Sequence, residues 1–156
     1  MTFEKTTRGS YGAKMPGANS APAKWVNRFM IKRFRRKGGG RSMGMDMLVL
    51  TTIGARSGQR RETLLGSFPD GDGAWLIVAS AAGSASNPAW YHNIAAHPGD
   101  VEVEVGGRKI KVSATQLSGA DRAEAWRKII AAQPRYAGYA TKTDRAIPVI
   151  RLAANS

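Results

Sequence analysis

The sequence contains no cysteine, which excludes disulfide bonds, thiolate metal sites and a cysteine nucleophile. No apolar run approaches the ~20 residues that a membrane-spanning helix needs. The opening residues MTFEKTTRGS carry no apolar stretch after their charges, so we expect no secretory signal. Only two histidines occur, His92 and His97, with no carboxylate at ligand spacing, so we expect no metal site. These absences are compatible with a cytoplasmic protein.

Acidic residues are also scarce. The chain has 11 Asp and Glu against 24 Lys and Arg, which gives a formal net charge of +13. An excess of this size concerns partners rather than fold. It indicates nucleic acid, an anionic membrane surface or a polyanionic small molecule.

The charge is concentrated near the N-terminus, because no acidic residue occurs between Lys5 and Met45. Residues 1–23 are rich in Gly, Ala, Ser and Pro, which predicts a mobile arm. Residues 24–41 form a basic segment, with a helix expected from about 23 to 37 and closed by three glycines. An imperfect apolar arc on this helix consists of Trp25, Val26, Phe29, Met30 and Phe34, interrupted by Arg33 and Lys37.

The chain after Asp46 is dominated by strand signals. The clearest is a hairpin, in which Val101–Val105 alternates, Gly106-Gly107 supplies the turn and Arg108–Ala114 returns. The alternation places valines toward the core and charges toward solvent. The expected cross-strand pairs are Glu104 with Lys109, Glu102 with Lys111, Val103 with Ile110 and Val101 with Val112. Further strands are expected at 47–52, 63–68, 74–80 and 147–152, with Pro148 near a strand start.

Two helices are expected between the strands. The first has Asn87 as N-cap and Pro88 at the first helical position, and it ends at His97-Pro98. The second opens with a capping box of Ser118 and Asp121 and stops at Pro134. Its expected buried stripe is Ala123, Trp126 and Ile130. Five or more strands with few helices and no βαβ alternation predict an antiparallel barrel of the α+β class and not a Rossmann fold.

Several kinds of chemistry find little support. No G-x-S-x-G elbow for a serine hydrolase is present. Glu102 and Glu104 are better explained as solvated partners of lysines than as a glycosidase pair. The basic loop from Thr51 to Arg61 follows a strand and carries arginines and glycines suited to an anion, although an ordinary basic hairpin explains it equally well.

Two more segments are suggestive. Ala79 to Tyr91 runs through small residues into a helix start, which leaves room for a flat ligand against Trp90. The alternative is that Trp90 and Tyr91 are core aromatics. Tyr136 and Tyr139 can donate a proton or a hydrogen bond, while surface packing remains their default role.

Together, in this order and spacing, these elements resemble the deazaflavin-dependent nitroreductase family. The resemblance runs from about Trp25 to the C-terminus. The matching stretches are Leu50–Arg61, Ala79–Asn93, the hairpin VEVEVGG and Tyr136–Pro148.

The resemblance implies a split β-barrel related to flavin-binding reductases, over residues 42–156. It also implies coenzyme F(420), a deazaflavin with a phospholactyl group and an oligoglutamate tail, whose negative charges would account for the basic excess. The implied cofactor residues are Thr51, with Arg56, Ser57, Gly58, Gln59 and Arg61 at the tail and phosphate, and Ala79, Ser80, Ala89, Trp90, Tyr91 and Asn93 at the ring. Tyr136 and Tyr139 are implied on the substrate side, and Tyr136 is also implied to contact the cofactor.

The implied reaction is hydride transfer from the deazaflavin C5 to an electrophilic carbon. Ser80 and Tyr136 are the expected hydrogen-bond donors to the developing anion, and Tyr139 or solvent supplies the final proton. A tyrosine with an ordinary pKa of ~10 is a donor, not a base, at neutral pH.

Two departures from the family pattern bear on the substrate. Ala81-Ala82 follows Ser80 where the family commonly has a basic residue, and Gln133-Pro134-Arg135 replaces an aromatic before the tyrosines. Nitroimidazole reduction is therefore not implied for this chain. Quinones and conjugated carbonyl compounds are equally acceptable electron acceptors, beside nitroaromatic and nitroimidazole compounds.

Other interpretations stay open at this point. The same fold can bind FMN, and a basic, aromatic segment can bind nucleic acid, although no nucleic acid is expected if the resemblance holds. Residues 1–37 can rest on the anionic inner face of the plasma membrane or form a lid over the substrate. We expect a monomer or a homodimer.

Overall fold

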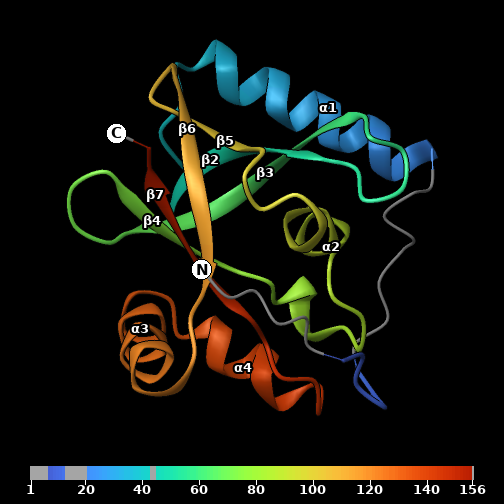
Figure 1. Ribbon diagram of the computed structural model, residues 1–156, viewed down its shortest axis with the longest axis vertical. Coiled ribbons are helices and arrows are strands. Elements are labelled where there is room, and N and C mark those ends of the chain that lie inside the picture. The colour runs from blue at the N-terminus through green and yellow to red at the C-terminus, as the bar shows by residue number, and fades with distance from the viewer. Residues whose placement is uncertain (1–6, 13–20, 43–44, 156) are drawn as a thin grey trace.

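The computed structural model describes residues 7–12, 21–42 and 45–155 (Figure 1). The strands are β1 (Arg41–Ser42), β2 (Met45–Ile53), β3 (Arg60–Pro69), β4 (Ala74–Val78), β5 (Val101–Val105), β6 (Arg108–Gln116) and β7 (Val149–Ala154). The helices are α1 (Ala21–Arg36), the 3-10 turn η1 (Ala81–Gly83), α2 (Ala89–Ala96), α3 (Gly119–Ala132) and α4 (Arg135–Thr141). No helix among these described residues is both long enough and apolar enough to span a membrane.

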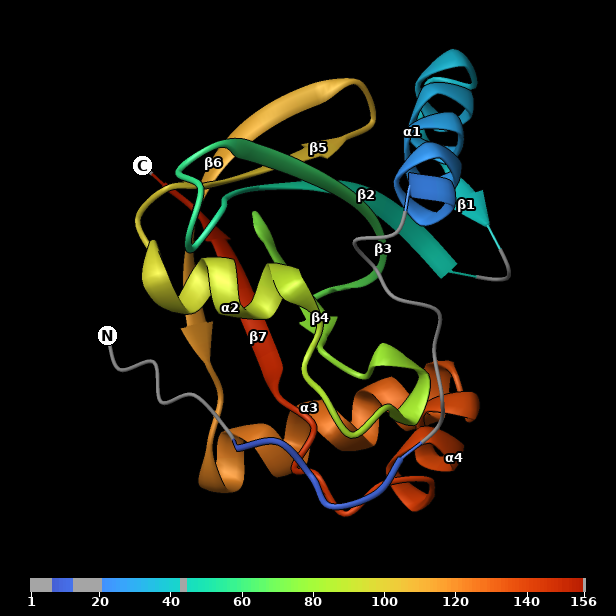
Figure 2. The same ribbon diagram turned by 90° about the vertical axis from the view of Figure 1, so that its right-hand side faces the viewer.

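The strands form one antiparallel sheet in the order β1-β2-β3-β4-β7-β6-β5. Because β2 also pairs with β5, through Val49 opposite Glu104 and Leu50 opposite Val103, the sheet closes on itself. The predicted antiparallel barrel is therefore confirmed. Figure 2 shows α1 at one end of the molecule and α3 with α4 at the other, with the barrel between them.

The barrel is filled by apolar side chains, most of them from β2, β4, β5, β6 and β7. Leu48, Leu50, Ile77 and Ile150 are fully buried there. Trp90, Tyr91 and Ile94 of α2 belong to the same cluster. Helix α2 therefore packs against the barrel core, and this packing fixes the position of the chain segments on either side of α2.

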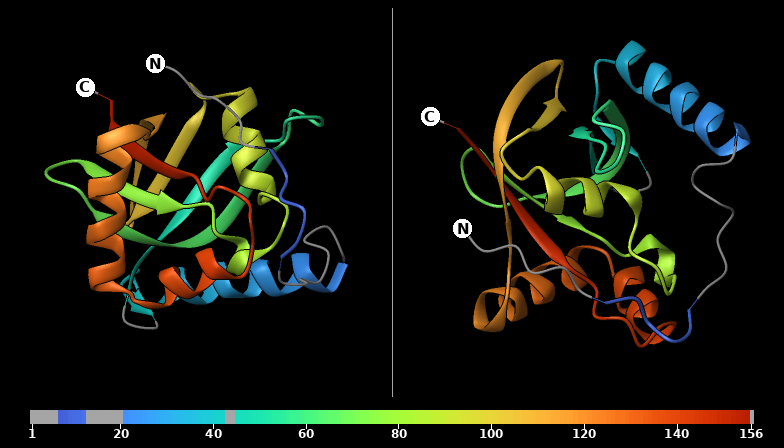
Figure 3. Two further views of the ribbon diagram at one scale, coloured as in Figure 1. Left: turned by 90° about the horizontal axis from the view of Figure 1, so that it is seen from below. Right: turned by 45° about the vertical axis from the view of Figure 1, so that its right-hand side comes forward.

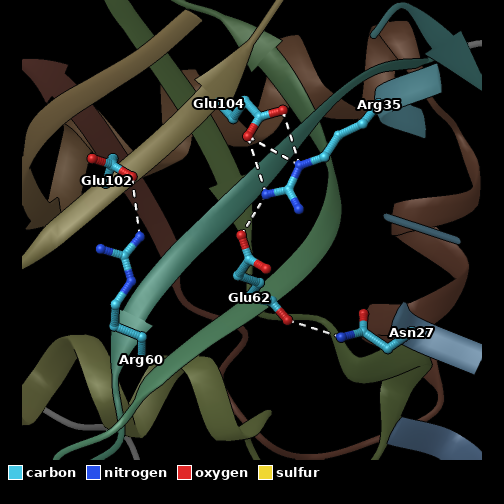
Figure 4. A network of polar contacts seen from close by, with 6 residues as sticks. All are labelled: Asn27, Arg35, Arg60, Glu62, Glu102 and Glu104. Atoms are coloured by element: carbon cyan, nitrogen blue, oxygen red, sulfur yellow. Dashed lines mark hydrogen bonds and ion pairs between the residues drawn. The ribbon is translucent and has the colours of Figure 1, made fainter. Parts of the chain in front are cut away.

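The hairpin of β5 and β6 has the register that the alternation predicted. Glu104 lies opposite Lys109, and Val103 lies opposite Ile110. The glutamates, however, do more than face lysines across the strands. Arg35 of α1 contacts Glu104 at 3.1 Å, and Arg60 contacts Glu102 at 3.5 Å (Figure 4). A helix distant in sequence thus uses the polar side of the hairpin as its docking surface.

The helix predictions are right in place and wrong in detail. Pro88, not Asn87, is the N-cap of α2, and the helix starts at Ala89. The Asn87 side chain instead accepts a hydrogen bond from Arg145. Ser118 is the N-cap of α3, but its side chain makes no capping hydrogen bond, so the predicted capping box does not form. The buried stripe of α3 is Ala125 and Ile129; of the predicted stripe, Trp126 and Ile130 are only partly buried and Ala123 is exposed.

Helix α1 confirms the predicted basic helix and is held by both apolar and polar contacts. Ile31 and Phe34 are buried against Val49 of β2. Arg35 reaches across to Glu62 and Glu104, and these hydrogen bonds, that to Glu104 first, raise the pKa of Arg35 above its ordinary value. Figure 4 shows this guanidinium between the two carboxylates. The docking fixes one face of α1 and leaves the opposite face outward.

Residues 7–12, within the predicted arm, run alongside the segment after η1 (Figure 3). Gly9 N–H donates to Ala85 O at 2.8 Å, and Thr143 Oγ1 donates to Tyr11 O at 2.6 Å. Ser10 hydrogen-bonds the Asp144 carboxylate through both its amide and its hydroxyl, and the hydroxyl contact is the main cause that lowers the pKa of Asp144. Residues 21–23 of the predicted arm belong to α1 instead, and residues 1–6 and 13–20 lie outside the described residues.

Candidate functional site

The basic loop predicted from sequence is the turn between β2 and β3. Gly54 N–H donates to Gln59 O at 2.8 Å, and Gly58 N–H returns to Gly54 O at 2.9 Å. Gly58 has a φ of 69°, a left-handed conformation that glycine adopts without strain. The side chains of this hydrogen-bonded turn point to solvent. Arg56, Ser57, Gln59 and Arg61 are all exposed, whereas Thr51 is buried within β2.

Asn93 connects this turn to α2. Its amide Oδ1 accepts the Ala55 N–H at 2.9 Å, and its Nδ2 donates to Thr52 Oγ1 at 3.2 Å. The side chain is buried, so these bonds act in a low-dielectric setting and hold the turn firmly. Two of the segments selected from sequence, the basic loop and the start of α2, are thereby brought together. The Asn93 side chain therefore positions the loop. Its direct contact with the ring of the implied cofactor stays a prediction.

The aromatic pair of α2 belongs to the barrel core. Tyr91 is fully buried and its hydroxyl donates to Gln116 Oε1 at 2.8 Å. Trp90 is 6% exposed and packs in the same cluster. Ala89 is exposed. The alternative that Trp90 and Tyr91 are core aromatics is confirmed. Any contact of these two side chains with a bound ligand must be made from within the barrel core.

The segment between β4 and α2 is organised by Arg145. This guanidinium donates to Ala79 O at 2.9 Å, Ser80 O at 2.8 Å and Ser84 O at 2.9 Å, and to Asn87 Oδ1 at 2.5 Å. Arg145 is 4% exposed, and burial lowers its pKa from the ordinary value. One side chain therefore fixes the whole loop that holds Ser80.

Sequence reasoning missed the role of Arg145, although the residue lies in the Tyr136–Pro148 stretch that carried the resemblance. The contacts to the loop span 58 to 66 residues along the chain, so no local pattern shows them. A weak signal exists, since Arg145 stands immediately before an apolar run into β7. A cation entering a core must satisfy its donors there.

The turn η1 replaces the basic residue of the family pattern with Ala81-Ala82. Ala81 has a φ of 44°, which is unusual for a residue with a Cβ. A Cβ placed on Gly83 would lie 2.8 Å from Lys142 Cβ and 2.9 Å from Tyr139 O. Helix α4 thus packs directly on η1, and it brings Lys142 beside the position where the basic residue is absent.

Tyr136 and Tyr139 come from α4 and touch each other edge to face, with ring centroids 5.4 Å apart. Tyr136 is buried against Phe68, and its hydroxyl approaches Met45 Sδ at 3.6 Å. Burial, followed by the neighbouring Tyr139, raises the pKa of Tyr136 above its ordinary value, while Arg135 opposes the shift. Tyr136 is therefore a neutral hydrogen-bond donor throughout the physiological range.

The raised pKa of Tyr136 has a measurable consequence for stability. Because the fold favours the neutral phenol, its contribution is complete below the unfolded pKa of ~10 and is lost as pH rises through the higher folded pKa. Urea unfolding between pH 9 and 11.5 should show a steeper alkaline loss for the wild type than for Tyr136→Phe. Tyr11→Phe, at a ring that is 58% exposed, is the control. Parallel curves for wild type and Tyr136→Phe would contradict this account.

A groove on the described surface lies away from these residues. It has a volume of about 510 Å³ and lies between α1 and the start of β3. The residues predicted around the ring do not line it. Its lining residues are Arg28, Ile31, Lys32, Arg35, Arg36 and Glu62.

Comparison with known proteins places these features in a family. The family model described as F(420)H(2)-dependent quinone reductase matches residues 25–153. A protein of Mycobacterium tuberculosis named F(420)H(2)-dependent quinone reductase is 43% identical over 108 residues, which cover 67% of this chain and 71% of that relative.

Two solved structures are similar over most of this chain. One, an F(420)-H2 dependent reductase (FDR-A), is 37% identical, covers 68% of this chain and 92% of its own, and has a TM-score of 0.61. Another, described as a domain-swapped dimer, is 33% identical, covers 85% and 99%, and has a TM-score of 0.64. The split β-barrel implied by the sequence is confirmed.

Proposed function

The chain belongs to the F(420)H(2)-dependent quinone reductase family, and we propose that its basic loop, the segment of Ser80 and helix α4 together form the active site. The reaction is hydride transfer from reduced coenzyme F(420) to a quinone-class acceptor. The FMN and nucleic-acid interpretations are not favoured. The site proposal rests on the two hydrogen bonds of the Asn93 side chain, which connect the basic loop to α2 beside the barrel wall.

The residues present suit a cofactor with a phosphate and several carboxylates. Arg56 and Arg61 are exposed and form no ion pair with any other residue that the structure describes. Their guanidinium groups are thus available to oxygen anions in a forked geometry. Ser57 and Gln59 add neutral donors on the same turn. Lys142, beside η1, is our candidate for the basic contact that Ala81-Ala82 does not supply.

When bound, the coenzyme supplies a hydride from its deazaflavin C5. Arg145 holds the carbonyls of residues 79, 80 and 84, and so fixes the backbone from which Ser80 projects. Ser80 Oγ and the neutral Tyr136 hydroxyl are the proposed donors to the quinone oxygen that becomes negative. A proton from Tyr139 or from water then completes the two-electron reduction to the hydroquinone. Nitroaromatic and conjugated carbonyl compounds are alternative acceptors for the same donors.

The function is tested by the loss of absorbance of reduced coenzyme F(420) in the presence of menadione. We expect turnover by the wild type and a kcat about 10- to 100-fold lower for Ser80→Ala, because one donor to the developing anion is lost. Ser86→Ala, an exposed serine of the same segment, should retain wild-type kcat. Absence of turnover with quinone, conjugated carbonyl and nitroaromatic acceptors alike would sink the proposed function.

We also propose that the outward face of α1 contacts the anionic inner face of the plasma membrane. Trp25 and Phe29 are 69% and 53% exposed and stack with ring centroids 6.1 Å apart. Val26 and Met30 extend this apolar surface, and α1 has no acidic residue. Exposed aromatics among cations are typical of helices that lie in a lipid interface.

Vesicle sedimentation tests the membrane contact. The full chain should pellet with vesicles containing phosphatidylglycerol and should remain in the supernatant with pure phosphatidylcholine. Trp25→Ser/Phe29→Ser should lose most of this binding, whereas Tyr11→Ser, at another exposed aromatic, should not. Equal sedimentation of both variants would contradict membrane binding by the outward face of α1. It would favour the alternative in which this helix is a lid over the substrate.

A further inference from the structure

We propose that the groove between α1 and the start of β3 is a polycarboxylate subsite that holds the oligoglutamate tail of the coenzyme. The inference rests on the proposed function, since the tail arrives with the cofactor. It assigns a role to α1 that is separate from the basic loop. The groove has a volume of about 510 Å³, and four of its six lining residues are cations.

Three of these cations form a stripe. Arg28, Lys32 and Arg36 are each four residues apart, so they project from one side of α1 at intervals of ~6 Å along its axis. All three are exposed, and none forms an ion pair with another described residue. Like charges at this spacing destabilise a helix. A negatively charged chain laid along the stripe would relieve that repulsion at three successive points.

The remaining charges of the groove cancel one another. Arg35 contacts Glu62 and Glu104, so the single carboxylate in the lining is already neutralised (Figure 4). Asn27 Nδ2 donates to Glu62 O at 2.8 Å and holds the helix against the strand. The groove thus has the already paired Glu62 on the β3 side and, on the α1 side, a row of three cations that form no ion pair with any described residue.

The groove and the basic loop both adjoin the start of β3. Strand β3 begins at Arg60, directly after the turn that carries Arg56, and Glu62 lies two residues further along. Residues two apart on a strand share a face, so Arg60 and Glu62 point to the same side (Figure 4). A tail leaving a phosphate held at the loop would therefore pass Arg60 and enter the groove beside Arg28. The path favours a cofactor tail over an unrelated anion.

Equilibrium dialysis with coenzyme forms that carry no glutamate and five glutamates tests the subsite. At low salt the wild type should bind the five-glutamate form about tenfold more tightly, because two or more surface ion pairs are gained. Arg28→Gln/Lys32→Gln should lose this preference and keep its affinity for the form without a tail. Arg33→Gln/Lys37→Gln removes the same charge from α1 and the residue that follows it, at two positions that do not line the groove, and should keep the preference.

Penta-glutamate peptide alone provides a readout without cofactor. It should bind the wild type and the control variant in calorimetry, and bind Arg28→Gln/Lys32→Gln about tenfold more weakly. Equal losses in the two variants, or no preference for the longer tail in the wild type, would overturn the subsite while leaving the proposed function intact. Failure of both coenzyme forms to bind would instead refute the proposed function.

Discussion

Arg145→Met is expected to lower the free energy of unfolding by about 3 kcal/mol, because several buried acceptors lose their donor at once and each unsatisfied group costs ~1–3 kcal/mol. The guanidinium is 4% exposed and hydrogen-bonds three carbonyls and the Asn87 amide. Relief of the buried charge offsets part of this cost, which keeps the expected loss below the sum of the four bonds. Urea unfolding followed by circular dichroism measures it.

Two further variants sharpen this prediction. Arg145→Lys keeps the charge but has a single nitrogen, so it should recover only part of the stability and less of the loop order. Arg151→Met is the control, since Arg151 also bonds a loop, through Asp70 at 2.7 Å, but is partly exposed. We expect a cost of about 1 kcal/mol or less there. Equal losses for Arg145→Met and Arg151→Met would show that Arg145 is not the organising residue.

Arg56→Gln/Arg61→Gln is expected to weaken coenzyme affinity about 100-fold or more, because charge-assisted hydrogen bonds to phosphate contribute ~1.5–3 kcal/mol each. Both side chains are exposed, so stability should change little. Equilibrium dialysis at two salt concentrations measures the affinity. The difference between wild type and variant should shrink as salt rises, since the lost contacts are electrostatic.

The matched control for the loop is Arg108→Gln/Lys109→Gln. These two residues are exposed cations at the start of β6, on another turn of the barrel. Their removal lowers the net charge equally and should leave affinity within about twofold of the wild type, as expected for distant screened charges. If both double variants lose affinity to the same extent, general charge and not the loop attracts the cofactor.

The sequence predicted the barrel well because its signals are local. Strict alternation around Gly106-Gly107 determines the hairpin register, since a one-residue slip would turn every valine to solvent. The errors occur where a distant partner competes with a local rule. Asn87 would suit an N-cap, yet Arg145 uses its side chain. The Ser118 side chain makes no capping bond, although α3 still begins after it.

The site was predictable in its segments but not in its connections. The basic loop and the α2 start were selected from residue types and resemblance, yet the bond between Asn93 and Ala55 joins residues 38 apart. Helix α4 escaped prediction because seven residues with a central glycine give no clear period. The docking of α1 through Arg35 likewise depends on the barrel bringing Glu62 and Glu104 together.

The most direct test of the central claim, dependence on a deazaflavin, is a titration of tryptophan fluorescence with oxidised coenzyme F(420) beside an identical titration with FMN. Trp90 lies in the barrel wall next to the proposed site and should report binding. We predict saturable, salt-sensitive quenching by coenzyme F(420) at concentrations at least tenfold below those needed for FMN. Tighter binding of FMN would keep the barrel but contradict the cofactor and the mechanism derived from it.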